Sequence, residues 1–268
     1  MKYKIVFSDI DGTFLNAQHE VLASTDQAVK RLIRQGIPLV LVSARMPEAI
    51  YPITDRMGIR IPVISYSGAL VVLADGTEIY SKTMQPAHTK AVLQEIVARW
   101  PSAVVNYYAG RHWYVRDTMD AMVQQEVRIT GAQPEQAGFA ALLAGGVLPN
   151  KLLCMCEPAV CAEMEHELGE AFPELNVVRS CDFLLEIMDT SISKAKGIEV
   201  LLQSMGLMRD EALAFGDNYN DVDMLRYVGM GVAMGNAPEP VKAAADDVTG
   251  ANDADGIAAF LKKCGLEG

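Results

Sequence analysis

Apolar runs of strand length alternate with longer amphipathic segments over the first 80 residues of the chain. The strand-length runs occupy residues 4–7, 38–42 and 62–65, and amphipathic segments of helix length fill residues 24–35 and 47–57 between them. A regular alternation of strands and helices is typical of a parallel sheet whose strands are joined by crossover helices. We therefore expect the chain to begin with a layered α/β sheet.

The pattern of apolar and polar residues changes in the middle of the chain. Neighbouring apolar runs follow one another there without a helix between them, which is typical of antiparallel strand pairs in an α+β module. The expected strands are 103–108, 111–115, 151–156, 175–179 and 183–188, and the expected helices are 88–100 and 159–168. Further helical material is expected before residue 151.

After residue 193 the alternation of helices and strands returns. The expected helices are 194–205, 220–227, 238–245 and 254–263, and the expected strands are 212–215 and 229–233. The simplest architecture is an α/β fold in which a parallel-sheet core, residues 1–83 and 189–268, is interrupted by an inserted α+β domain, residues 84–188. A chain of 268 residues is long enough for two such domains.

Composition excludes several classes of partner. Asp and Glu outnumber Lys and Arg by 34 to 23, and the formal net charge is −11. Such a chain repels the phosphates of nucleic acids and of anionic lipids. Near the N-terminus the apolar run covers only residues 5–7, which is too short for a signal peptide or a membrane span. We expect a cytoplasmic protein, monomeric or homodimeric, with no nucleic-acid or membrane partner.

Two acids directly follow the first expected strand, in the string FSDIDGT. Asp9 and Asp11 are two residues apart, so on an extended segment their carboxylates face the same way. Open α/β sheets bind ligands at the carboxyl ends of their strands, where these acids lie. Gly12 lets the backbone approach an anion closely, and Thr13 adds a hydroxyl and an amide donor. The alternative interpretation is a turn capped by acids.

A second acidic cluster lies in the string AFGDNYNDVDML. Asp217 follows an expected strand, and Asp221 comes four residues later, at the start of an expected helix. Carboxylates at this spacing share one helical face, and carboxylate oxygens are ligands that suit Mg²⁺. The alternative is that both acids merely cap the helix. Our hypothesis is a magnesium site.

Two further residues complete a phosphate site. Ser43 ends the second strand, where its hydroxyl can hold an oxyanion, and Lys194 begins a late helix whose amides favour an anion. Four ionised aspartates and a phosphomonoester dianion carry about −6, against about +3 from Mg²⁺ and Lys194. The excess predicts that one carboxyl keeps its proton. We assign that proton to Asp11, which would then serve as general acid and base.

Four motifs, in this order and spacing, resemble those of the haloacid dehalogenase superfamily. They are DIDGT at residues 9–13, Ser43 after a strand, Lys194 at the start of a late helix, and GDNYND at residues 216–221. The segment MGVAMGNAPEPVKAAADDVT, followed by DGIAAFL, resembles the Cof-type sugar-phosphatase branch. The resemblance runs essentially from end to end, and it implies a Rossmann-like core with a large α/β cap domain as the insertion.

The resemblance also implies roles for individual residues. Asp9 would be the nucleophile that forms an aspartyl phosphate, and it would also ligate Mg²⁺. Asp11 would be the acid and base, with its backbone carbonyl on the metal. Asp217 would be a direct metal ligand, and Asp221 a direct or water-mediated one. Ser43 and Lys194 would bind the transferring phosphoryl group, and Asn220 would help to position the phosphate or Lys194.

Two positions depart from the pattern of the family. The loop after the third strand reads YSGAL, with Ser67 where the family often has Asn. The second motif reads Ser-Ala-Arg, ending at Arg45, where the family often has Thr-Gly-Arg. Both Ser67 and Arg45 are candidate substrate contacts, and Arg45 has the alternative of pairing with an acid of the core.

These observations predict a Mg²⁺-dependent phosphomonoester hydrolase that acts on small phosphorylated metabolites, above all sugar phosphates. Within the same chemistry, the alternatives are a phosphatase dedicated to a nucleotide or to pyridoxal phosphate, and a phosphomutase. A signalling module phosphorylated on aspartate belongs to another class, although receiver domains lack an insertion of this length. A catalytically silent metabolite-binding protein is a third class, and the complete set of four motifs argues against it.

Overall fold

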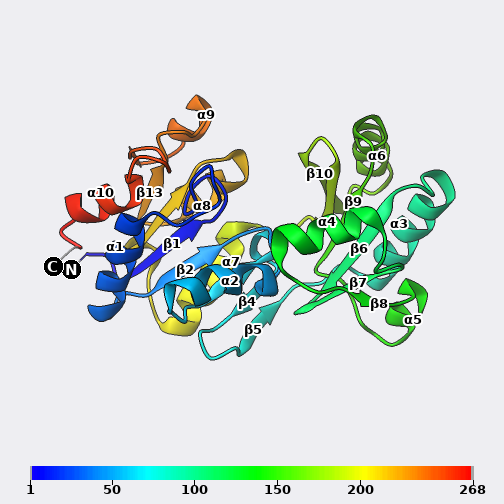
Figure 1. Ribbon diagram of the computed structural model, residues 1–268, viewed down its shortest axis with the longest axis horizontal. Coiled ribbons are helices and arrows are strands. Elements are labelled where there is room, and N and C mark those ends of the chain that lie inside the picture. The colour runs from blue at the N-terminus through cyan, green and yellow to red at the C-terminus, as the bar shows by residue number, and fades with distance from the viewer. Residues whose placement is uncertain (1, 267–268) are drawn as a thin grey trace. The chain divides into compact units, whose positions relative to one another are not determined.

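The computed structural model of the protein describes residues 2–266 and divides into two compact units (Figure 1). One unit combines Met1–Tyr80 with Ser193–Gly268, and the other is Ser81–Ile192. The first unit is therefore discontinuous in sequence, and the second is inserted into it. We call them the core unit and the inserted unit.

A sheet of eight strands, counted within residues 2–266, forms the centre of the core unit. In spatial order the strands are β14 (Asp247–Val248), β13 (Met230–Ala233), β12 (Ala212–Gly216), β1 (Ile5–Asp9), β2 (Leu39–Val42), β3 (Val63–Ser65), β4 (Leu70–Val72) and β5 (Glu78–Ser81). From β14 to β3 all neighbours are parallel, and β4 runs antiparallel to β3. The central strands β1, β2 and β12 are buried along their whole length, as expected for parallel strands covered on both faces.

Helices cover both faces of this sheet (Figure 1). Ile5 and Phe7 of β1 pack with α7 and α8 on one face, whereas Phe215 of β12 meets Phe260 of α10 on the other, with ring centroids 5.8 Å apart. The helices of the core unit are α1 (Ala23–Arg34), α2 (Pro47–Met57), α7 (Lys194–Met205), α8 (Val222–Tyr227), α9 (Glu239–Lys242) and α10 (Gly256–Lys263), with 3-10 turns η1 (Tyr66–Gly68), η2 (Arg209–Glu211) and η3 (Tyr219–Asp221). This layering brings the carboxyl ends of β1, β2 and β12 to one edge.

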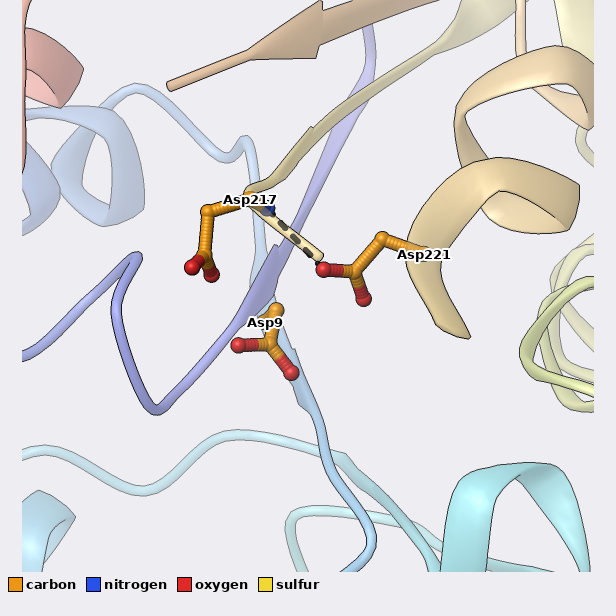
Figure 2. Close-up of side chains that lie close together, drawn as sticks. All are labelled: Asp9, Asp217 and Asp221. Carbon is orange, nitrogen blue, oxygen red and sulfur yellow. Dashed lines mark hydrogen bonds between the residues drawn. The ribbon is translucent and has the colours of Figure 1, made fainter. Parts of the chain in front are cut away.

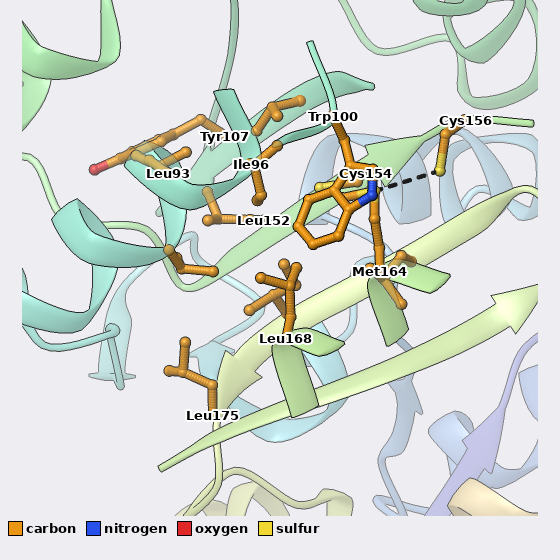
Figure 3. Close-up of a cluster of buried hydrophobic side chains, with 14 of the residues drawn as sticks. Leu93, Ile96, Trp100, Tyr107, Leu152, Cys154, Cys156, Met164, Leu168 and Leu175 are labelled. Atoms are coloured by element: carbon orange, nitrogen blue, oxygen red, sulfur yellow. Dashed lines mark hydrogen bonds between the residues drawn. The ribbon is translucent and has the colours of Figure 1, made fainter. Parts of the chain in front are cut away.

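The inserted unit contains a second, mostly antiparallel sheet. In spatial order its strands are β10 (Leu175–Cys181), β11 (Leu184–Asp189), β9 (Lys151–Met155), β6 (Val104–Ala109), β7 (His112–Val115) and β8 (Glu135–Gln136). Its helices are α3 (Pro86–Arg99), α4 (Ala121–Thr130), α5 (Phe139–Ala144) and α6 (Pro158–Ala171). Side chains of α3, α5 and α6 and of the sheet form a hydrophobic cluster, which includes Trp100, Cys154 and Cys156 (Figure 3). The cysteines pack here as small apolar side chains.

The predicted fold class, a parallel-sheet α/β core interrupted by an α+β insertion, is confirmed. Several local expectations were wrong. The helix expected over 238–245 is limited to α9, because the Asp246 amide donates to the Gly231 carbonyl and draws the chain into β14. The helix expected from residue 220 begins at Val222, after a 3-10 turn. Strands β8 and β14, of two residues each, are too short to leave a periodic pattern.

Candidate active site

Three aspartates gather at the carboxyl edge of the core sheet (Figure 2). Asp9 is the last residue of β1, and Asp217 directly follows β12, the parallel neighbour of β1. Asp221 is the last residue of η3. One carboxylate oxygen of each aspartate lies within 4.8 Å of the other two. The topology therefore brings together acids that are more than 200 residues apart in the sequence.

A buried lysine joins two of these carboxylates. Lys194 is the first residue of α7, and its side chain is 1% exposed. Its Nζ donates to Asp9 Oδ1 and to Asp221 Oδ1, each at 2.5 Å. The helix can begin this close to the loop after β3 because Gly68, at φ 109°, has no Cβ to collide with the Ser193 carbonyl.

Burial and charge together set the protonation of the cluster. Burial by itself lowers the pKa of Lys194, but the carboxylates of Asp9 and Asp221 outweigh it and raise that pKa. Burial raises the pKa of Asp9 to about 8; Lys194 opposes this shift, and the nearby carboxylates of Asp221 and Asp217 add to it. Burial also raises the pKa of Asp217. The cluster thus holds more negative charge than Lys194 neutralises, and a further cation would relieve it.

Asp221 is fully buried, and both of its carboxylate oxygens accept hydrogen bonds. Oδ1 accepts from Lys194, and Oδ2 accepts from the backbone amides of Asp217 and Asn218 at 2.9 and 3.0 Å. These bonds orient the lysine and fix the backbone that carries Asp217. They support a positioning role for Asp221 beside its predicted role as a direct or water-mediated metal ligand.

Asp11 lies outside the three-acid cluster and pairs with Arg45. Its two carboxylate oxygens accept hydrogen bonds from Arg45 Nε and Nη2 at 2.8 and 2.6 Å, and its side chain is 45% exposed. The backbone amide of Arg45 donates to Ser43 Oγ at 3.2 Å. The sequence assigned the spare proton to Asp11, and burial raises the pKa values of two other acids of the site, Asp9 and Asp217. The structure therefore shows the alternative given for Arg45, pairing with an acid of the core.

The other predicted phosphate contacts lie around the same edge. Thr13 is 2% exposed and donates its hydroxyl to Asp217 Oδ1 at 2.6 Å, so in this structure it supports a carboxylate. Ser43 is 3% exposed and follows β2. The Ser67 amide donates to the Ser43 carbonyl at 2.9 Å, which places Ser67 beside the second motif. Asn220 is exposed within η3.

An asparagine that the sequence motifs do not single out links the loop after β1 to the acidic cluster. Asn236 Nδ2 donates to the Gly12 carbonyl at 2.9 Å and lies 3.5 Å from Asp217 Oδ2. Its Oδ1 accepts from the Asn252 amide, which fixes the orientation of the side-chain amide. The Asn252 side chain in turn donates to the Leu15 carbonyl. A signal was available, because Asn236 lies three residues after the end of strand β13, in the string MGNA.

We expect Asn236→Ala to weaken Mg²⁺ binding by about tenfold or more, because outer-shell partners orient metal ligands. The measurement is a calorimetric titration of Mg²⁺ into protein without substrate. Asn176→Ala, which truncates an exposed asparagine of β10, is the matched control and should leave binding unchanged. Equal Mg²⁺ affinity in both variants would contradict a positioning role for Asn236.

We expect Gly12→Ala to destabilise the fold and disrupt the site. Gly12 has φ 84°, and a Cβ there would overlap the carboxylate of Asp217. At Gly76, φ 89°, such a Cβ would meet no heavy atom within 4 Å from the described residues beyond its chain neighbours, so Gly76→Ala carries the same backbone strain without the collision. The difference between their free energies of unfolding should be about 1–3 kcal/mol, measured by denaturant titration. Equal losses would mean that the Asp217 carboxylate moves aside freely.

The donor set of the cluster fits a magnesium ion. All of its candidate ligand atoms are carboxylate oxygens, and Mg²⁺ usually takes one or two protein carboxylates and completes its shell with water and substrate phosphate. Asp9 and Asp217 would hold the ion, because Asp221 is fully buried and both of its oxygens accept hydrogen bonds of 3.0 Å or less. Asp217 Oδ2, by contrast, has a weaker contact of 3.5 Å with Asn236. The ion would supply the positive charge that the cluster lacks.

Comparison with known proteins identifies the family of the chain. The family of haloacid dehalogenase-like hydrolases matches residues 6–261. A Haemophilus influenzae protein named as a candidate phosphatase is 37% identical over 265 residues, 98% of each chain. The Escherichia coli pyridoxal phosphate phosphatase YbhA is 27% identical, over 97% of this chain and 98% of its own.

Solved structures show the same relationship. A haloacid dehalogenase-like hydrolase from Bacteroides thetaiotaomicron matches with a TM-score of 0.88 and 31% identity, over 98% of this chain and 100% of its own. A subclass IIB sugar phosphatase of the superfamily matches with a TM-score of 0.81 and 25% identity, over 98% and 99%. The chain therefore belongs to the haloacid dehalogenase-like hydrolase family. The prediction of a hydrolase of the phosphatase class is confirmed. No helix within residues 2–266 has the length and apolarity that a membrane span requires.

Proposed function

We propose that the protein is a Mg²⁺-dependent phosphomonoester hydrolase that forms an aspartyl phosphate on Asp9. The observation that carries the proposal is the contact of Asp9 with Lys194 inside the three-acid cluster. A carboxylate nucleophile, a lysine for the phosphoryl oxygens and ligands for a divalent ion are the parts that phosphoryl transfer needs. Bound Mg²⁺ would neutralise charge on the transferring phosphoryl group.

The reaction would proceed in two displacements. A carboxylate oxygen of Asp9 attacks the phosphorus, the bond to the leaving oxygen breaks, and Asp11 in its protonated form gives that oxygen a proton. Asp11 then takes a proton from water, which attacks the phosphorus and breaks its bond to Asp9. Free phosphate leaves and Asp9 is regenerated. To act as the acid, Asp11 must carry a proton and must leave Arg45 to contact the leaving oxygen of the substrate. The hydrogen bonds from Arg45 would therefore control whether Asp11 can donate that proton.

We propose small phosphorylated metabolites as substrates, with sugar phosphates first. The subclass IIB sugar phosphatase among the solved structures supports this class, and the YbhA relative supports pyridoxal phosphate as the second candidate. The test is a phosphate-release screen over about a hundred phosphorylated metabolites with and without Mg²⁺. Broad activity on sugar phosphates supports the first candidate, and one dominant substrate of another kind overturns it. The absence of Mg²⁺-dependent release from any compound would overturn the proposed function.

We expect Mg²⁺ to stabilise the protein more at about pH 9 than at about pH 6, because protons and metal ions compete for the same carboxylates. The pKa of Asp9 is raised from 3.8 to about 8 in the folded, metal-free protein. Between pH 3.8 and about 8 the folded state keeps a proton on Asp9 that the unfolded chain has released. The free energy of unfolding therefore falls as the pH rises through this range. Thermal melts with and without Mg²⁺ measure the difference. An equal shift at both pH values would contradict metal binding by Asp9.

A further inference from the structure

The inserted unit carries an apolar groove between α3 and α5. Its volume is about 690 Å³, within the range of about 300–1,000 Å³ that is typical of small-molecule sites. Leu93 and Val97 of α3 line one side, and Phe139 and Leu143 of α5 line the other. Leu93 also belongs to the hydrophobic cluster beneath (Figure 3), so the groove has a packed floor.

Helix α5 has an unusual composition for an exposed helix. Its sequence is FAALLA, without a polar residue, and two glycines follow it. A helix that is apolar on all sides is normally buried. Here Ala140 and Ala144 are exposed along the groove, and Val97 on the facing helix is 42% exposed. Within residues 2–266, this apolar face therefore remains open to solvent.

The charges at the groove have one sign. Lys90 and Arg116 are its ionisable lining residues, and no carboxylate from residues 2–266 lines it. In the described part of the chain neither cation is paired with an acid, and the Arg116 guanidinium lies over the Phe139 ring at 5.2 Å. The chain as a whole carries a net charge of −11, so this local excess of positive charge is a departure from the rest of the molecule.

We propose that this groove binds a small amphiphilic anion, a molecule with an aromatic or aliphatic body and one carboxylate or sulfonate head. The apolar body would displace water from the walls formed by α3 and α5. The head would be neutralised by Lys90 and Arg116. The site lies wholly within the inserted unit and does not depend on the phosphatase chemistry proposed above.

The test uses anilinonaphthalene sulfonate, a fluorescent probe with aromatic rings and one sulfonate. We expect the native full-length protein to bind one probe molecule per chain, and decanoate to displace it. Leu143→Glu places a carboxylate in the wall and should weaken binding by about tenfold or more. Val97→Glu, at an exposed position of the facing helix, repeats the test if the first variant fails to fold.

The contribution of the cations is tested separately. The double variant Lys90→Gln, Arg116→Gln should weaken probe and decanoate binding by about three- to tenfold. The dissociation constant of the neutral decanol, obtained from competition with the probe, should be unchanged. Arg128→Gln and Ile129→Glu, exposed residues of α4 outside the groove, are the matched controls and should change nothing.

Four results would overturn the proposal. The first is that the native protein does not bind the probe, and the second is that Leu143→Glu and Val97→Glu both bind it as well as the native protein does. The third is that the α4 control variants lose as much affinity for the probe as the wall variants. The fourth is that the native protein sediments as a dimer and the wall variants sediment as monomers. The last result would assign the apolar face to a second copy of the chain.

Discussion

Asp9→Asn is expected to lower turnover of any phosphorylated substrate by about 10⁴-fold or more while the fold survives. The amide cannot form the aspartyl phosphate, but its oxygen can still accept the hydrogen bond of Lys194. Burial and the nearby carboxylates of Asp217 and Asp221 disfavour the ionised form of Asp9 and raise its pKa. A neutral asparagine at this position removes that repulsion. The melting temperature without metal should therefore stay the same or rise.

The measurements are phosphate release, thermal melting and intact mass. The native protein, quenched in acid during turnover, should carry one phosphoryl group, and the variant none. Asp26→Asn, which breaks a surface ion pair with Lys30 at 2.9 Å, is the matched control and should keep full activity. Undiminished hydrolysis by Asp9→Asn would remove the proposed mechanism.

Lys194→Met is expected to have the largest effect on stability. The methionine fills a similar volume but leaves Asp9, 7% exposed, and Asp221, 0% exposed, without their cation. Removing one partner of a buried ion pair typically costs about 3–5 kcal/mol. Turnover should also fall sharply, because the proposed contact to the phosphoryl oxygens is lost.

Lys196→Met, on the same helix, provides a matched control. Lys196 has a side chain that is 47% exposed and pairs with Glu199 on the surface at 2.5 Å. Surface pairs of this kind contribute about 0–1 kcal/mol. Denaturant titrations of both variants, with and without Mg²⁺, measure the contrast. Equal free energies of unfolding for Lys194→Met and Lys196→Met would show that Lys194 does not compensate the buried carboxylates of Asp9 and Asp221.

The parallel arrangement of the core strands and the sheet edge that carries the site could be predicted from local patterns, whereas the order of the strands could not. The apolar runs of β1, β2 and β12 indicate parallel strands that are covered by helices on both faces, because a strand that packs on both faces needs mainly apolar residues. Parallel strands point the same way, so residues that follow them, such as Asp9 and Asp217, are brought to one edge. The short elements β8 and β14 left no pattern, since two residues have no measurable period.

The sequence by itself determined which chemical groups stand at the ends of the central strands, since burial periodicity and turn residues are local properties. The tertiary structure alone decided how those groups pair. It placed Lys194 between two carboxylates, paired Asp11 with Arg45, and brought Asn236 to the loop after β1. Such pairings depend on distances between loops that are remote in the chain, and only the packed sheet and its helices fix those distances.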